Sequence, residues 1–221
     1  NFDSGLLSID GTLRCENVLR MGSVGAATLR AGSLENVGAM LGRGVIDAPT
    51  INTANISFSG DSSFNEDFTN NSTGLLIVSG GSAMTFYEDV VNTAGGEIRV
   101  STGCAATYFG SVSGSGNFTG AGTSYLEGDM RPGASPGAMH FEGDVVFGVM
   151  SQLHVELDGP TAASQYDQVI VDGSASLDGN LEVDLDAAYV PLTGRWFDVL
   201  AAGSRSGTFA GPEAVGYAPG K

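Results

Sequence analysis

Short apolar runs separated by turn residues recur along the whole chain, and they predict β-strands rather than helices. Runs of Val, Ile, Leu, Phe and Thr are interrupted roughly every five to ten residues by Gly, Asn, Asp or Ser. Helical periodicity is nearly absent. We therefore expect an all-β fold made of short strands and tight turns.

An internal repeat organises the middle of the chain. Equivalent segments begin at Phe64, Phe86 and Tyr108, which are spaced by 22 residues, and Asn92 falls on Asn70. The same alignment places Val90 on Phe68, Ile98 on Leu76 and Val100 on Val78. If consecutive units stack, the three aromatic side chains form one column inside the fold and the two asparagines form an amide ladder.

A repeat of this length predicts a parallel β-solenoid. One unit alone cannot enclose its apolar side, so each must stack on its neighbour. About 22 residues are too few for a propeller blade, but they fit one coil of two or three strands that lies roughly 4.8 Å above the previous coil. We predict a parallel β-solenoid over residues 1–137.

The pattern changes after residue 137. Apolar and acidic residues alternate strictly in residues 153–158 and again in 181–186, which predicts strands with one apolar face and one solvated face. We expect residues 138–211 to form a C-terminal β-cap that closes the solenoid, followed by a flexible tail over residues 212–221.

Several motifs taken together resemble the passenger β-helices of bacterial autotransporters and related surface adhesins. They occupy residues 70–78, 132–137, 164–171, 197–200 and 207–211. The resemblance implies a secreted right-handed β-helix on the bacterial cell surface that serves as an adhesin, stalk or matrix component.

Composition narrows the range of partners. The chain has 9 basic and 25 acidic residues, and its net charge is −16. Nucleic acid is an improbable partner because few side chains could neutralise phosphates, and an anionic membrane surface is disfavoured for the same reason. No apolar run reaches the roughly 18 residues of a membrane-spanning helix.

Paired acidic residues form the one candidate metal site. Glu66 and Asp67 occupy the same position in the repeat as Glu88 and Asp89. Stacking would gather four carboxylates within roughly 5 Å of one another, and Ca²⁺ would relieve their repulsion. The alternative is that the four side chains spread from an exposed corner into water. No other cofactor is expected.

Other candidate sites are weak. Residues 133–137 match the G-x-S-x-G pattern, but Pro136 has no N–H for an oxyanion hole, so a turn is expected there. His154 lies in an alternating strand, where we expect a solvated side chain. Cys15 and Cys104 are about four repeats apart, too far for a disulfide, and we predict that both are unpaired.

These observations favour a protein that is not an enzyme. We expect a secreted structural or adhesive solenoid that associates with itself, end to end or laterally, into fibres or matrix, and with other cell-surface components. The alternative is a carbohydrate-binding or polysaccharide-lyase β-helix.

Overall fold

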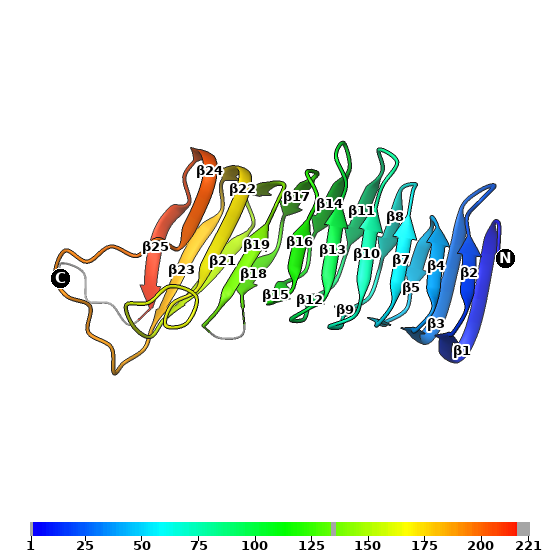
Figure 1. The fold of residues 1–221 in the computed structure, drawn as a ribbon, viewed down its shortest axis with the longest axis horizontal. Coiled ribbons are helices and arrows are strands. Elements are labelled where there is room, and N and C mark those ends of the chain that lie inside the picture. Colours follow the sequence, from blue (N-terminus) through cyan, green and yellow to red (C-terminus); the bar gives the residue numbers. More distant parts are fainter. Residues whose placement is uncertain (1, 134–135, 216–221) are drawn as a thin grey trace.

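The chain folds into a parallel β-solenoid. The computed structural model describes residues 2–133 and 136–215, and these contain 25 strands and no helix. Figure 1 shows the strands stacked side by side along one long axis, with β1 and β25 at opposite ends of the stack. Every pairing between the named strands is parallel, as an uninterrupted coil requires.

The strands form three faces, which we number by their order within one coil. The first face contains β2 (Val18–Met21), β4 (Ala39–Gly42), β7 (Asn55–Phe58), β10 (Leu75–Val78), β13 (Glu97–Val100), β16 (Asn117–Thr119) and β19 (Ala138–Phe141). The second face contains β5 (Val45–Asp47), β8 (Ser62–Phe64), β11 (Ala83–Phe86), β14 (Ala105–Tyr108), β17 (Thr123–Leu126) and β20 (Asp144–Phe147).

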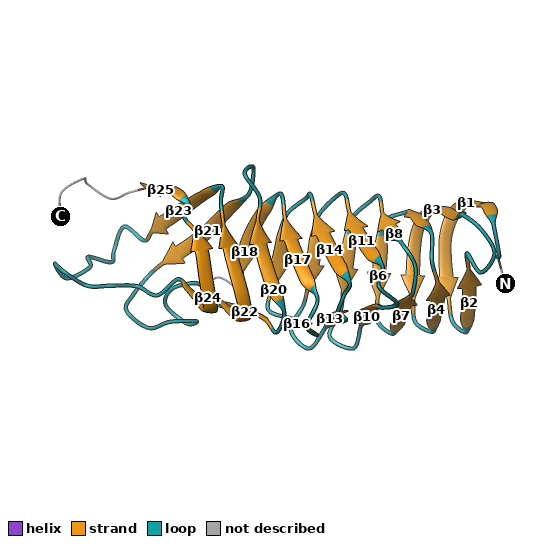
Figure 2. Cartoon of the chain, turned by 90° about the horizontal axis from the view of Figure 1, so that it is seen from above, coloured by secondary structure: helices purple, strands orange, loops and turns teal. Residues whose placement is uncertain are grey.

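The third face contains β6 (Thr50–Asn52), β9 (Phe68–Asn70), β12 (Val90–Asn92), β15 (Val112–Gly114), β18 (Asp129–Pro132), β21 (Gln152–Leu157), β23 (Asn180–Leu185) and β25 (Ala210–Val215). Four longer strands each contribute to two faces: β1 (Gly5–Cys15), β3 (Ala27–Asn36), β22 (Gln168–Leu177) and β24 (Leu200–Gly207). Figure 2 shows the loops that join successive strands along the molecule.

The core is a continuous column of apolar side chains, because alternate residues of every short strand point inward. The predicted aromatic stack is confirmed. The Phe64 and Phe86 rings lie 5.5 Å apart with an interplanar angle of 5°, and the Phe86 and Tyr108 rings lie 4.9 Å apart at 1°.

The asparagine ladder is also confirmed, and it is longer than the repeat predicted. Asn70 Nδ2 donates to Asn92 Oδ1 at 2.9 Å, Asn52 Nδ2 donates to Asn70 Oδ1 at 2.8 Å, and Asn36 Nδ2 donates to Asn52 Oδ1 at 2.8 Å. All four side chains are fully buried. Their spacings along the chain are 16, 18 and 22 residues, so a search at a fixed period of 22 finds only the last pair.

The segment expected to form a cap continues the same stack. Within residues 138–211, β19 pairs with β16, β20 with β17 and β21 with β18, all in parallel. Their outward positions carry polar residues, but the coils keep the three-face arrangement. Of the tail expected over residues 212–221, residues 212–215 belong to β25 and the others lie outside the described residues.

Candidate functional site

A polar cluster centred on His154 occupies the outward side of the third face. The parallel register between β21 and β23 places His154 beside Glu182, and in the neighbouring coil β18 contributes Asp129 and Arg131. These residues share one surface because alternate positions of each strand point outward. The cluster therefore depends on the stacking of three consecutive coils.

Both ring nitrogens of His154 face charged groups. Nδ1 lies 2.9 Å from Glu182 Oε2, while Nε2 lies 3.3 Å from Asp129 Oδ2 and 3.2 Å from an Arg131 guanidinium nitrogen. A neutral ring with its proton on Nδ1 donates to Glu182 and accepts from Arg131, whereas a doubly protonated ring donates to both carboxylates. The position expected to be solvated is in fact enclosed, since 19% of the His154 side chain is exposed.

The cluster lines a cavity of about 360 Å³ on the third face. Around His154 it is lined by Ser113, Arg131, Pro132, Gly133, Val155, Glu156, Asp167, Glu182 and Asp184. Most of these are hydrogen-bonding or charged groups. The cavity can therefore hold a small polar molecule whose hydroxyl groups bond to carboxylates and to a guanidinium.

Asp167 closes one side of this cavity and fixes the segment that follows β21. Its side chain is 3% exposed. One carboxylate oxygen accepts the Gly137 N–H at 2.7 Å and the other accepts the Glu156 N–H at 2.9 Å. Burial raises the pKa of Asp167, and the two backbone hydrogen bonds oppose that shift. Asp167 therefore serves as a structural clamp.

The acidic residues of the predicted calcium site lie at an exposed corner between the second and third faces. Glu66, Asp67, Glu88 and Asp89 are all exposed. Asp67 accepts the Asp89 N–H at 3.3 Å, and Asp89 accepts the Ser111 N–H at 2.8 Å.

The two aspartates thus tie each coil to the next through the backbone. Among the residues that the structure describes, no group of three or more His, Cys, Asp or Glu side chains is arranged to hold a metal ion. The Ca²⁺ site at Glu66, Asp67, Glu88 and Asp89 stays a prediction.

The remaining predicted positions behave as follows. Cys15 and Cys104 are buried and unpaired, as predicted. The pKa of the Cys15 thiol is raised by burial, which disfavours the reactive thiolate. The central residues of the G-x-S-x-G segment, 134 and 135, lie outside the described residues.

The sequence did not reveal the His154 cluster because its geometry depends on one long coil. His154 and Glu182 are register partners, and the coil between them includes the long segment that contains residues 158–167. They are therefore further apart in the sequence than one repeat. The only sequence signal for these residues was the alternation of apolar and polar positions around His154 and around Glu182.

No helix in the described part of the chain is long and apolar enough to cross a membrane. No protein-family model matches the chain, and searches of the curated proteins and of the solved structures also give no match.

Proposed function

We propose that this chain is an extracellular structural or adhesive element of a bacterial surface, with no catalytic activity. The observation that carries the proposal is the stacking of parallel coils, without a change of architecture, from β1 to β25. In a solenoid each coil contacts only its neighbours, so its length extends along one axis and its outer faces become a long display surface.

The interior supports a stiff rod. The asparagine ladder and the aromatic stack both run parallel to the long axis and link consecutive coils. Bending the solenoid would open these contacts on one side. Both features therefore favour a spacer or scaffold role over that of a compact domain.

The ends of the solenoid offer a route to self-association. In the described part of the chain, β1 pairs only with β3, β24 only with β22 and β25 only with β23. The other edge of each of these strands has no partner among the described residues, and such an edge can pair with a further strand. Near β25, the segment 186–199 extends from the stack in Figure 1. It carries Val190, Leu192 and Trp196, which are 81%, 73% and 93% exposed.

Electron microscopy and analytical ultracentrifugation of the purified chain test this proposal. We expect rods that join end to end into filaments as protein concentration rises. Surface labelling of intact cells tests the location, and we expect the chain to be labelled without lysis. A chain that stays monomeric at every concentration and is inaccessible on intact cells would contradict the proposal.

The second candidate is a carbohydrate-binding or polysaccharide-lyase β-helix, and the cavity around His154 favours it. A lyase needs a base near a sugar carbon and a cation near its carboxylate, and His154 and Arg131 supply those residue types within one cavity. Incubation with acidic polysaccharides separates the candidates. Unsaturated products would support the lyase, whereas filaments without turnover support the scaffold.

A further inference from the structure

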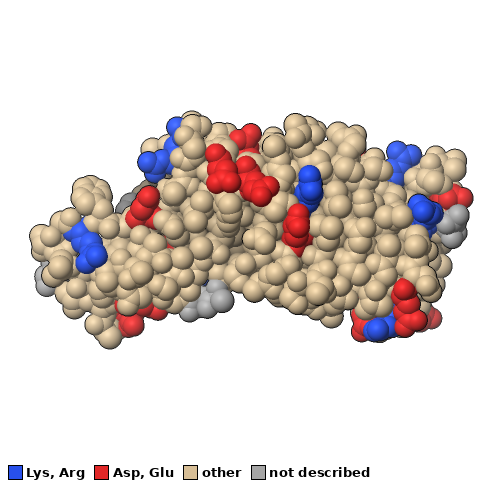
Figure 3. All heavy atoms as spheres, viewed as in Figure 1, with Lys and Arg blue, Asp and Glu red and all other residues tan. Residues whose placement is uncertain are grey.

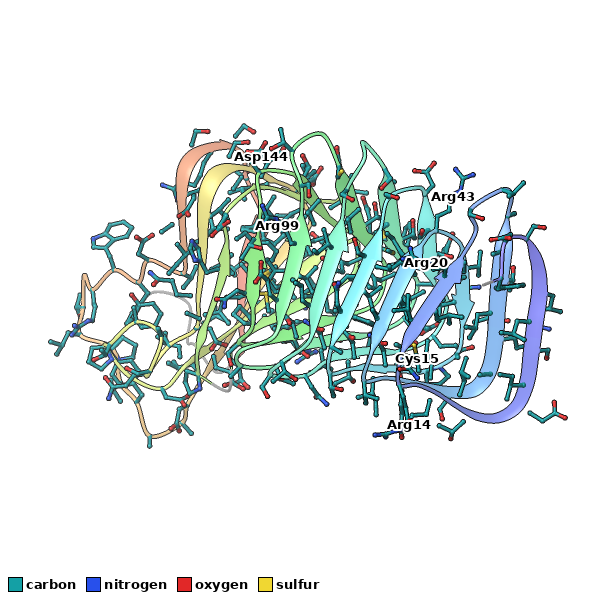
Figure 4. The ribbon with its side chains drawn as sticks, turned by 45° about the vertical axis from the view of Figure 1, so that its right-hand side comes forward. Arg14, Cys15, Arg20, Arg43, Arg99 and Asp144 are labelled. Carbon is teal, nitrogen blue, oxygen red and sulfur yellow. The ribbon has the colours of Figure 1, made fainter. Side chains whose placement is uncertain are left out.

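A second cavity, near the N-terminal end of the solenoid, is lined by two arginines. Its volume is about 470 Å³. Arg20 lies on β2, Arg43 follows β4, and Ser57 and Ser59 come from the next coil. Met21, Gly22, Ser23, Leu41 and Gly42 complete the lining. Figure 4 shows Arg20 and Arg43 near this end of the molecule and Arg99 several coils further along.

Arg43 is held in place by its neighbours. Its Nε donates to the Gly22 carbonyl oxygen at 2.9 Å. A side chain at Gly60 would place its Cβ 2.4 Å from Arg43 Cδ, so the absence of that side chain makes room for the arginine. The Nε contact orients the guanidinium and leaves its two terminal nitrogens for another partner.

Neither arginine of this cavity has an acidic partner. Among the described residues, no carboxylate lies within 4.0 Å of the Arg20 or Arg43 guanidinium, whereas Arg14, Arg30 and Arg131 each form an ion pair. Arg99, Arg195 and Arg205 also have no ion pair among the described residues, so what distinguishes Arg20 and Arg43 is that these two exposed arginines line the same cavity. Figure 3 shows basic side chains at both ends of this face of the molecule, and acidic side chains are present at its N-terminal end as well as further along it.

This arrangement favours a bound oxyanion. Two guanidinium groups that line one cavity repel each other, and a shared anion turns that repulsion into attraction. The planar guanidinium fork matches the two oxygens of a carboxylate or sulfate group. Serine hydroxyls can donate to the same oxygens.

The size of the cavity indicates what carries the oxyanion. A single sulfate or carboxylate would fill only a small part of 470 Å³. The remaining lining combines the hydroxyls of Ser57 and Ser59 with the apolar side chain of Leu41. A hexose ring presents hydroxyls at its rim and an apolar C–H face, so it fits both kinds of surface. We propose that this cavity binds one acidic sugar residue, with its carboxylate or sulfate between Arg20 and Arg43.

Titration of the protein with sugars, monitored by the NMR chemical shifts of its backbone amides, tests the assignment. We expect glucuronate and a hexose sulfate to cause saturable shifts confined to the cavity-lining residues, and glucose at the same concentration to cause none. Inorganic sulfate should bind at least about tenfold more weakly, because it lacks the ring contacts. Binding of sulfate as tight as that of the sugars would overturn the assignment to a sugar, and the absence of shifts with either acidic sugar would overturn the site.

Substitutions identify the cavity as the source of binding. Arg20→Gln should weaken glucuronate binding by about tenfold or more, because one charge-assisted contact is lost. Arg99→Gln is the matched control. Arg99 is exposed, lies in the same outward row of the first face, and has no ion pair among the described residues. Equal effects of the two substitutions would overturn the proposal, and thermal unfolding verifies that both variants fold. The scaffold proposal does not depend on this result.

Discussion

At the scale of single residues, the solenoid depends on side chains that bond from one coil to the next. Asn70 is the best example, because its amide accepts from Asn52 and donates to Asn92. It also donates to the carbonyl oxygens of Gly74 and Glu97, at 3.1 Å each. Its side chain is fully buried, so each bond lost leaves a polar group unsatisfied.

We predict that Asn70→Ala lowers the free energy of unfolding by about 3 kcal/mol, because it leaves buried groups on both neighbouring coils without partners. Asn70→Asp should cost more, since a carboxylate cannot donate and its charge would be buried. Asn71→Ala is the control, and we expect a change within about 0.5 kcal/mol. Urea unfolding measures all three. Equal stability of the Asn70 and Asn71 variants would contradict a role for the ladder.

Asp144 makes a comparable link at the surface. One carboxylate oxygen accepts both the Ser174 backbone N–H and the Ser174 hydroxyl, each at 2.7 Å. These hydrogen bonds lower the pKa of Asp144 below its ordinary value of 3.8. A lowered pKa means that the ionised group stabilises the folded state above the unfolded-state pKa, and that this contribution is lost as the pH falls through the folded-state pKa.

We therefore predict that Asp144→Ala destabilises the protein by about 1 kcal/mol at neutral pH, a modest value because the site is partly exposed. The difference from the wild type should shrink as the pH falls below about 3.8. Ser174→Ala is the partner control. It removes one donor and keeps the backbone N–H, so it should cost less. Unfolding experiments at several pH values across this range test the prediction. A stability difference between Asp144→Ala and the wild type that does not change with pH would argue against an ionised Asp144.

At the scale of elements, close contact between coils restricts the strand ends. Gly114 ends β15 directly above Asn92, and its φ is +99°. A Cβ at this position would lie 2.1 Å from the Asn92 carbonyl oxygen. The asparagine ladder ends here, because Gly114 occupies the next position in that column and carries no side chain.

We predict that Gly114→Ala destabilises the protein by about 3 kcal/mol or more, since a backbone clash adds to the cost of a positive φ. Gly81→Ala separates the two causes. Gly81 also has a positive φ, +72°, but a Cβ added there would have no atom within 4 Å. Its substitution should therefore cost about 1–2 kcal/mol. Similar losses at both positions in thermal or urea unfolding would show that the contact with Asn92 is unimportant.

At the scale of the whole molecule, the segment 186–199 carries three large and strongly exposed apolar side chains, those of Val190, Leu192 and Trp196. This segment is anchored at Phe197, whose ring contacts Tyr166 and Tyr189 edge to face with centroid distances of 5.4 and 6.3 Å. Trp196 is nevertheless almost fully exposed. An anchored segment that presents large apolar side chains near one end of a rod is suited to contact between molecules.

We predict that Trp196→Ser with Leu192→Ser reduces end-to-end association at least about tenfold, because contact would bury both apolar side chains. The matched control replaces Val149 and Met150 with serine. These residues are 67% and 78% exposed, but they lie in the turn between β20 and β21, away from the last coil. Analytical ultracentrifugation compares the pairs. An equal loss of association in both double variants would indicate nonspecific hydrophobic association instead of an end contact.

The amino-acid sequence by itself determined the stacking of the central coils. Residues at equal spacing lie over one another when coils of equal length stack, so the repeat predicted that Phe64, Phe86 and Tyr108 share one column. The free cysteines and the all-β class followed from the same local pattern.

Only the tertiary structure decided which residues lie beside one another on neighbouring coils of unequal length. Turn lengths vary, and a parallel register tolerates that variation because only the strands must align. His154 therefore meets Glu182, and Arg20 shares a cavity with Arg43 and Ser57, at spacings that no fixed repeat predicts. The aromatic stack and the Asn70–Asn92 pair were visible in the sequence because their residues recur at a spacing of 22. The rest of the asparagine ladder and the two cavities were not, because no fixed spacing links their residues.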